Sequence, residues 1–92
     1  MIGGFKHRGL KRLYERDDRG GIRPDLVDKV QEILTVLDDA ANPQDLNLPG
    51  YRLHPLQGGL KGFWSVTVRA NWRIIFRFRG ADAFDVELID YH

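Results

Sequence analysis

Three histidines, His7, His54 and His92, are the side chains of this sequence whose ordinary pKa lies near neutrality. His54 stands in the run L-H-P-L, and His92 follows Asp90 and Tyr91 at the end of the sequence. A proton donor and a proton acceptor within one site permit general acid–base catalysis. We therefore take His54 and His92 as candidate proton carriers and Asp90 as a candidate base or orienting partner.

Positive charge is concentrated in the second half of the sequence. Residues 51–79 contain six basic residues and no acidic one, although the net charge of the whole chain is only +1. Such a stretch favours an anionic ligand. Cleavage of RNA by its own 2′-hydroxyl requires a base, an acid and a cation that stabilises the charge on the phosphoryl oxygens. Arg73, Arg77 and Lys61 are the candidate cations, and Tyr91 is the candidate for stacking on an unpaired base.

Each candidate also has a plain structural explanation. His54 fits the end of a strand, Arg77 fits an exposed strand position, and Tyr91 fits a cap on the core. Chain ends are commonly frayed, which is the alternative for His92. A metal site built from His54, Asp90 and His92 has suitable ligand types, but its spacing matches no metal-binding motif. We therefore expect neither a metal nor another cofactor.

The run W-S-V-T-V-R-A-N-W-R-I-I-F predicts an antiparallel hairpin, because apolar and polar side chains alternate on both sides of one turn. A three-residue loop over residues 69–71 makes one face wholly apolar, whereas a two-residue loop mixes arginines into that face. Asn71 would take the left-handed position of this loop. The predicted pairs are Trp64 with Phe76, Val66 with Ile74, and Val68 with Trp72.

The remaining elements complete a single domain, residues 1–92, of the α+β class. We predict a short strand at residues 2–5, helices over 6–16 and from Pro24 to about Ala41, an edge strand at 51–56 and a last strand at 83–89. Two N-terminal helices then pack on one face of an antiparallel sheet of four to five strands. The other face, which carries Arg73 and Arg77, is left for solvent or a ligand.

Strand alternation sets a geometric condition on the end of the chain. A regular last strand places Asp90 and His92 on one side and Tyr91 on the other. The three residues can act together only if the strand bends or bulges near Asp90.

Several classes of protein are excluded or disfavoured. The chain has no cysteine, so disulfides and thiolate metal sites are excluded. Residues 1–8 lack the apolar segment of a signal peptide, and the longest apolar run is Ile74–Phe76, so we expect a cytoplasmic protein without a membrane segment. P-loop, dinucleotide-binding and G-x-S-x-G motifs are absent from the sequence.

Three runs of the sequence resemble one known family. They are FKHRGLKRLYE, YRLHPLQGGLKGFWSVTVRANWRIIFRF and DAFDVELIDYH, and together they span nearly the whole chain. They resemble the HigB-type toxins of bacterial toxin–antitoxin pairs, within the RelE/ParE superfamily. The resemblance implies a RelE-like fold with helices on one side of a curved antiparallel sheet. It also implies a metal-independent endoribonuclease that cuts mRNA in the ribosomal A site.

The resemblance further implies partners and an active site. The partners are a HigA-type helix-turn-helix antitoxin, the small ribosomal subunit with its A-site mRNA, and operator DNA through the antitoxin only. Carried over by motif, the site comprises His54, Asp90, Tyr91 and His92, with Arg73 as the phosphate contact.

One position departs from the family pattern. The family often reads H-P-L-K-G, whereas this sequence has Gln57 in place of the lysine. A catalytic or rRNA-contacting cation is therefore missing there, so we expect either that Lys61 or Arg52 compensates for it or that the activity is weaker. Together with Arg77, these residues form the predicted RNA-binding set.

Two other functions remain open at this point. The chain could be a non-nucleolytic inhibitor on the same fold, such as a gyrase poison or a toxin that perturbs ribosome assembly, because fold does not fix function. It could also act only as a co-repressor with its antitoxin. The terminal His92 argues against the inhibitor, which needs no set of proton-transfer residues, whereas the co-repressor role stays open.

Overall fold

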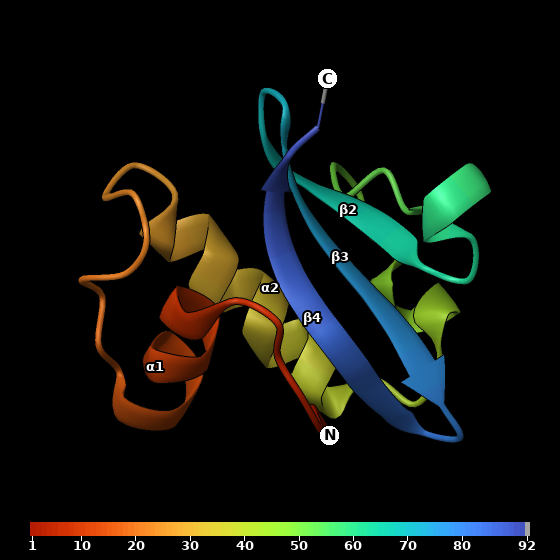
Figure 1. Ribbon diagram of the computed structural model, residues 1–92, viewed down its shortest axis with the longest axis horizontal. Helices are drawn as coiled ribbons and strands as arrows, with labels where there is room; N and C mark the ends of the chain where they lie inside the picture. The colour runs from red at the N-terminus through yellow and green to blue at the C-terminus, as the bar shows by residue number, and fades with distance from the viewer. Residues whose placement is uncertain (92) are drawn as a thin grey trace.

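A computed structural model describes residues 1–91 and has two helices lying on one face of a four-stranded antiparallel sheet (Figure 1). The elements are α1 (Arg8–Arg16), α2 (Val27–Asp39), η1 (Pro43–Leu46), β1 (His54–Pro55), η2 (Gly58–Leu60), β2 (Trp64–Arg69), β3 (Trp72–Arg79) and β4 (Asp82–Asp90). The strands lie in the order β1-β2-β3-β4. None of the helices in the described part of the chain is long and apolar enough to cross a membrane. The predicted α+β class is confirmed.

Helix α1 begins two residues later than predicted, because His7 is its N-cap. His7 has an extended backbone, and its Nδ1 accepts a hydrogen bond of 3.1 Å from the backbone N–H of Leu10. This bond satisfies one of the N–H groups that the first turn leaves without a helical partner. Leu10 and Leu13 form the buried face of the helix, as their spacing predicts.

Helix α2 is shorter than predicted at both ends. Pro24 lies in a turn before the helix, in which Leu26 N–H donates to the Arg23 carbonyl at 2.9 Å. The helix ends at Asp39, so Ala41, expected to close the apolar stripe, lies outside it and is exposed. The buried stripe of the helix consists of Val27, Val30, Ile33, Leu34 and Leu37.

The segment before α1 runs along the outer edge of β4, where a short first strand was predicted. It forms only two isolated parallel bridges, Ile2 with Ala83 and Phe5 with Val86. Gly3 is needed between them because a Cβ there would lie 2.5 Å from the Phe84 ring. The segment covers backbone groups of β4 that would otherwise form an unpaired sheet edge.

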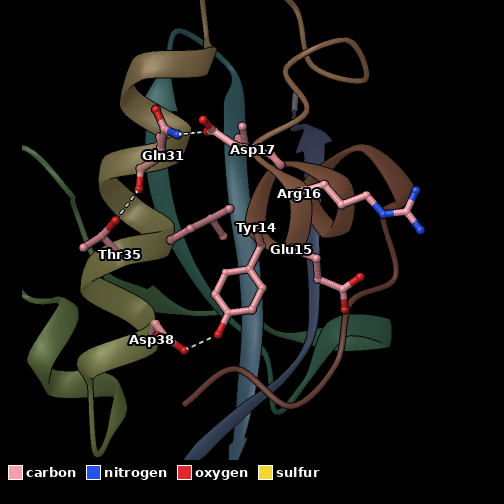
Figure 2. A pocket seen from close by; sticks show the side chains of 9 residues that line it. Tyr14, Glu15, Arg16, Asp17, Gln31, Thr35 and Asp38 are labelled. Carbon is pink, nitrogen blue, oxygen red and sulfur yellow. Dashed lines mark hydrogen bonds between the residues drawn. The ribbon is translucent and has the colours of Figure 1, made fainter.

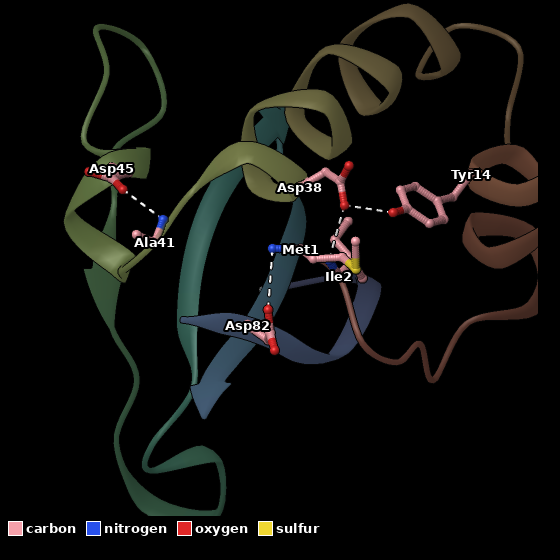
Figure 3. Close-up of polar contacts among 7 residues, drawn as sticks. All are labelled: Met1, Ile2, Tyr14, Asp38, Ala41, Asp45 and Asp82. Atoms are coloured by element: carbon pink, nitrogen blue, oxygen red, sulfur yellow. Dashed lines mark hydrogen bonds and ion pairs between the residues drawn. The ribbon is translucent and has the colours of Figure 1, made fainter. Parts of the chain in front are cut away.

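Asp38 of α2 holds this N-terminal segment against the helices (Figure 3). Its Oδ1 accepts hydrogen bonds from Ile2 N–H at 3.0 Å and from the Tyr14 hydroxyl at 2.6 Å. The Tyr14 hydrogen bond lowers the pKa of Asp38 and raises the pKa of Tyr14 to about 12. The Met1 amino group forms an ion pair with Asp82 at 3.4 Å. One carboxylate therefore connects the N-terminal segment to both helices.

The hairpin has most of the predicted register but a different turn. Val66 pairs with Ile74 and Trp64 with Phe76, as predicted. Arg69, not Val68, pairs with Trp72, because β2 bulges between Thr67 and Arg69. The loop is consequently the two residues Ala70 and Asn71, and Ala70 rather than Asn71 has the positive φ, 51°. The bulge keeps the arginine side chains away from the apolar face. The prediction had assumed that a three-residue loop was needed for this.

Apolar side chains pack on both faces of the sheet. The main core lies between the helices and the sheet face that carries Val66, Ile74 and Phe76, as predicted. On the opposite face, here called the open face, Leu56 and Phe63 bury Ile75 to 1% exposure. The prediction left this whole face to solvent or a ligand, which is wrong for its centre.

Strand β4 is irregular at Asp85, five residues before the expected position. Asp85 has φ 53°, and the β3–β4 register shifts between Ile75 and Arg77. Asp90 still pairs with Trp72, so the strand is paired to its last residue. The bulge turns Phe84 onto the open face opposite Arg77, while Val86 remains in the core.

Candidate functional site

His54 lies on the open face at the β1 edge of the sheet. It pairs with Ser65 on β2, Ser65 pairs with Ile75 on β3, and Ile75 pairs with Glu87 on β4. Paired residues share a face, so these four side chains form one row across the open face. The imidazole is exposed, and its Nδ1 lies 3.1 Å from the Arg52 carbonyl. A donor Nδ1–H to that carbonyl leaves Nε2 as a proton acceptor facing outward.

Arg73 lies on the same face, one row closer to the β2–β3 turn. It pairs with Thr67 on one side and Ile89 on the other. Its Nη1 donates to the Ala70 carbonyl at 2.6 Å and to the Trp72 carbonyl at 3.2 Å. Its Nε is buried and has no hydrogen-bond partner within residues 1–91. The Arg73 guanidinium is therefore held at the turn, and Nε is not used in these hydrogen bonds.

The end of β4 lies at the same turn. Asp90 pairs with Trp72, and Tyr91 N–H donates to the Asn71 carbonyl at 2.8 Å. Figure 1 shows the C-terminal end of the chain beside the β2–β3 turn. The Tyr91 side chain is 43% exposed, which leaves its ring accessible to a ligand. The predicted site residue His92 lies outside the described residues.

The predicted catalytic residues lie in two places and not all on one face, because Asp90 pairs with Trp72 and so shares the face that the helices cover. Arg73, Asp90 and Tyr91 gather at the β2–β3 turn, whereas His54 lies on the opposite edge strand. Three strand spacings separate β1 from β4, about 14 Å. A direct hydrogen bond between His54 and Asp90 is excluded at that separation. A ligand that contacts both groups must extend across the sheet.

The predicted RNA-binding residues differ in their surroundings. Lys61, Gln57 and Arg52 are exposed, and their side chains make no hydrogen bond or ion pair within the part of the chain that the structure describes. Arg77 instead forms an ion pair with Asp85, with Nη2 2.6 Å from Oδ2. Sequence reasoning missed this partner, because Asp85 reaches Arg77 only through the β4 bulge. The roles of all four residues remain predictions.

Metal ligands do not converge on the open face. Among residues 1–91, no three His, Cys, Asp or Glu side chains lie close enough together to hold a metal ion. The chemistry that the arrangement offers is proton exchange at His54 and Asp90, with charge stabilisation by Arg73.

A hollow in the described part of the molecule lies elsewhere, between α1 and α2 (Figure 2). It encloses about 500 Å³ and is lined by Leu13, Tyr14, Glu15, Arg16, Asp17, Gln31, Leu34, Thr35 and Asp38. Its polar groups are largely paired with one another, as in the 2.9 Å hydrogen bond from Gln31 Nε2 to Asp17. None of the predicted site residues lines it, and it contains no histidine.

Comparison with known proteins identifies the family. The sequence model of the family described as "RelE-like toxin of type II toxin-antitoxin system HigB" matches residues 3–92. The chain belongs to this HigB toxin family. It is 46% identical over 92 residues to "Endoribonuclease HigB" of Proteus vulgaris, covering 100% of both chains. It is 36% identical over 76 residues to "Toxin HigB-1" of Vibrio cholerae serotype O1, covering 80% of each.

Solved structures of related toxins have the same fold. YafQ from E. coli strain BL21(DE3) matches with a TM-score of 0.62 and 17% identity, over 96% of this chain and 91% of that one. A YoeB/ParE toxin from Agrobacterium tumefaciens matches with a TM-score of 0.58 and 15% identity, over 100% and 99%. The expected RelE-like architecture of a HigB toxin is confirmed. As a type II toxin, the chain has an antitoxin as its partner.

Two residues of this HigB toxin escaped the sequence analysis. Glu87 is half-buried at the β4 end of the row that begins at His54. Lys6 extends from the N-terminal segment to within 5.4 Å of the Phe63 ring centre. Both lie in runs that carry the resemblance, but no motif singles them out; Glu87 is placed by pairing with Ile75 on β3, and Lys6 by the hydrogen bonds of the N-terminal segment to β4. Only the tertiary structure could reveal them.

Proposed function

We propose that this HigB toxin is a ribosome-dependent endoribonuclease that cuts mRNA in the A site without a metal ion. The observation that carries the proposal is its 46% identity, over the whole of both chains, to a protein named an endoribonuclease. The structure supports it, because Arg73 on the open face and Asp90 and Tyr91 at the end of β4 all lie at the β2–β3 turn. The other functions considered, a gyrase poison, an assembly inhibitor or a pure co-repressor, have no such observation in their favour.

The reaction begins with removal of the 2′-hydroxyl proton by a base. The 2′-oxygen attacks the adjacent phosphorus, and the bond to the 5′-oxygen breaks as that oxygen receives a proton. The products are a 2′,3′-cyclic phosphate and a 5′-hydroxyl. We assign proton exchange to His54, Asp90 and His92, stabilisation of the phosphoryl charge to Arg73, and stacking on the A-site nucleotide to Tyr91.

Contacts to the rest of the RNA fall to the exposed cations. Lys61 and Arg52 flank Gln57, the position at which the family often has lysine, and Arg77 lies further along β3. The proposed partners are the small ribosomal subunit with mRNA, and a HigA-type helix-turn-helix antitoxin through which the complex binds operator DNA. The proposed location is the cytoplasm.

Controlled expression in bacteria tests the proposal. Wild-type protein should arrest growth, and primer extension should show new 5′ ends inside codons of translated messages. His92→Ala, or deletion of residues 90–92, should lower the cleavage rate by about 10²–10⁴-fold, the usual contribution of one acid–base group. Lys11→Gln, an exposed change on α1, is the control and should cleave normally.

Two further measurements separate the parts of the proposal. Cleavage by purified protein should require intact ribosomes, and protein treated with EDTA and then freed of it before addition to the ribosomes should cleave as fast as untreated protein. Growth arrest without new 5′ ends would contradict a nuclease, and DNA damage in those cells would favour the gyrase alternative. Unchanged cleavage by both His92→Ala and the 90–92 deletion would contradict the assignment of the site.

A further inference from the structure

Lys6 is carried onto the open face by the N-terminal segment. The Phe5–Val86 bridge packs Phe5 against the main core, so the next residue turns to the other face. Lys6 N–H donates to the Val86 carbonyl at 2.9 Å, which fixes its backbone beside β4. Its Nζ lies 5.4 Å from the centre of the Phe63 ring, which precedes β2. The Lys6 side chain therefore extends over β4 and β3.

Arg77 shares the same ring. Its Cζ lies 5.2 Å from the Phe63 ring centre, so one ring carries two cations. Asp85 pairs with Arg77 through Nε at 2.7 Å and Nη2 at 2.6 Å, and Nη1 takes no part in this ion pair. Lys6 has no carboxylate within ion-pair distance in residues 1–91. Lys6, Arg77 and Asp85 together carry a net charge of +1, before the carboxylate of Glu87, which lies on the same face, is counted.

Phe63 is hydrogen-bonded to and packed against Leu56, the residue before the position where a family cation is missing. Leu56 N–H donates to the Phe63 carbonyl at 2.9 Å, and Leu56 and Phe63 pack together on Ile75. Gln57 directly follows Leu56. The Lys6 ammonium thus lies over the cluster that borders Gln57, although it comes from the opposite end of the sequence.

We propose that Lys6 and Arg77, held over Phe63, form a phosphate-binding site on the open face, with Lys6 supplying the cation that Gln57 does not. The three N–H bonds of the ammonium and the remaining Nη1 of Arg77 are the donors to phosphodiester oxygens. The phosphate belongs to the substrate mRNA or to ribosomal RNA. The inference rests on the proposed function, since it assumes that the open face binds RNA.

The test compares Lys6→Gln with Lys11→Gln, which removes the same charge from α1. Binding of a non-cleavable 2′-O-methyl oligonucleotide is measured at several salt concentrations. Loss of one phosphate contact should reduce the slope of log K against log salt by about 0.7 for a single strand. Lys6→Arg should retain the wild-type slope, and so should Lys11→Gln. The same series with isolated small ribosomal subunits identifies the source of the phosphate.

The outcomes are distinguishable. A reduced slope for Lys6→Gln with the oligonucleotide assigns the site to mRNA, and a reduced slope only with subunits assigns it to ribosomal RNA. If Lys6→Gln gave wild-type slopes with both the oligonucleotide and the subunits, the proposed phosphate-binding site would be wrong. Thermal unfolding of Lys6→Gln checks that the variant is folded. If wild-type protein fails to cleave RNA at all, the proposed function fails, whereas normal cleavage with unchanged slopes rejects only the Lys6 site.

Discussion

Arg73 and Arg77 have the same side chain on the same strand and face, yet they are placed for different tasks. Arg73 uses Nη1 on two turn carbonyls and keeps a buried Nε without a partner in residues 1–91. Arg77 is neutralised by Asp85 and stacked on Phe63. An unsatisfied buried donor is costly, so a ligand oxygen that reached Nε would gain more at Arg73 than at Arg77, whose Nε already donates to Asp85.

His7 should make the stability of the protein depend on pH. Burial lowers the pKa of His7 from the usual 6.5. The charge of Glu87 raises this pKa, and the charge of Arg12 lowers it. Protonation of Nδ1 also removes the acceptor that caps α1. Because the folded pKa is depressed, this stabilisation is complete above pH 6.5 and is lost as the pH falls through the folded pKa.

The measurement is urea unfolding of wild type and His7→Ser between pH 7.5 and 5.5. Serine caps a helix without titrating in this range, so the variant should lose less stability on acidification. The difference should be about 0.5–1 kcal/mol, the usual value of one N-cap. Parallel curves for the two proteins would show that the cap does not titrate.

At the level of elements, the β2–β3 turn holds the end of β4 in place. Ala70 has φ 51°, a left-handed conformation that costs a residue with Cβ about 1 kcal/mol or more. Ala70→Gly should therefore stabilise the protein by up to about 1 kcal/mol, and Ala70→Val should destabilise it.

The neighbouring turn offers a matched control. Ala81 lies in the β3–β4 turn without a positive φ. Ala81→Gly should be neutral or destabilising, because there glycine only increases the entropy of the unfolded chain. Urea unfolding measures all three variants. Equal effects of glycine at both positions would contradict the role assigned to the backbone at Ala70.

Local patterns predicted the elements better than their irregularities. Alternation of side chains predicted the pairing of Val66 with Ile74, because burial of one face decides register. It did not predict the bulge at Asp85, since an aspartate in the left-handed region leaves no mark on the pattern of apolar residues. That bulge places Asp85 beside Arg77. The ion pair of this predicted cation could therefore not be inferred from the sequence either.

For the whole molecule, the pairing of the N-terminal segment with β4 is the feature that no local pattern contains. It brings Lys6 to the open face and attaches Ile2 to Asp38 of α2. Both arise from bridges between the first and last parts of the chain. Motifs predicted the residue types of the candidate site. The pairing between the first and last parts of the chain, in contrast, could be learned only from the fold.

Gly3 tests this closure of the sheet edge. Gly3→Ala places a Cβ 2.5 Å from the Phe84 ring, whereas Gly4→Ala meets that ring at an ordinary 3.6 Å. Because Phe84 is only half-buried and can shift, Gly3→Ala should cost about 1 kcal/mol, at the low end for overpacking. Urea unfolding measures the cost, and light scattering should detect self-association through the uncovered β4 edge. Gly4→Ala should resemble wild type in both, and a Gly3→Ala protein as stable as wild type would contradict the close approach.

The Ile2–Ala83 bridge joins residues 81 positions apart (83 − 2), nearly the full length of the chain. Contacts of such long range form late, because the entropy of closing the intervening chain is lost before the contact gains anything. During synthesis β4 is the last of the four strands to be made, so its edge stays open and Lys6 stays away from Phe63 until β4 has left the ribosome. The fold thus delays closure of the sheet edge and completion of the open face until its last strand is available.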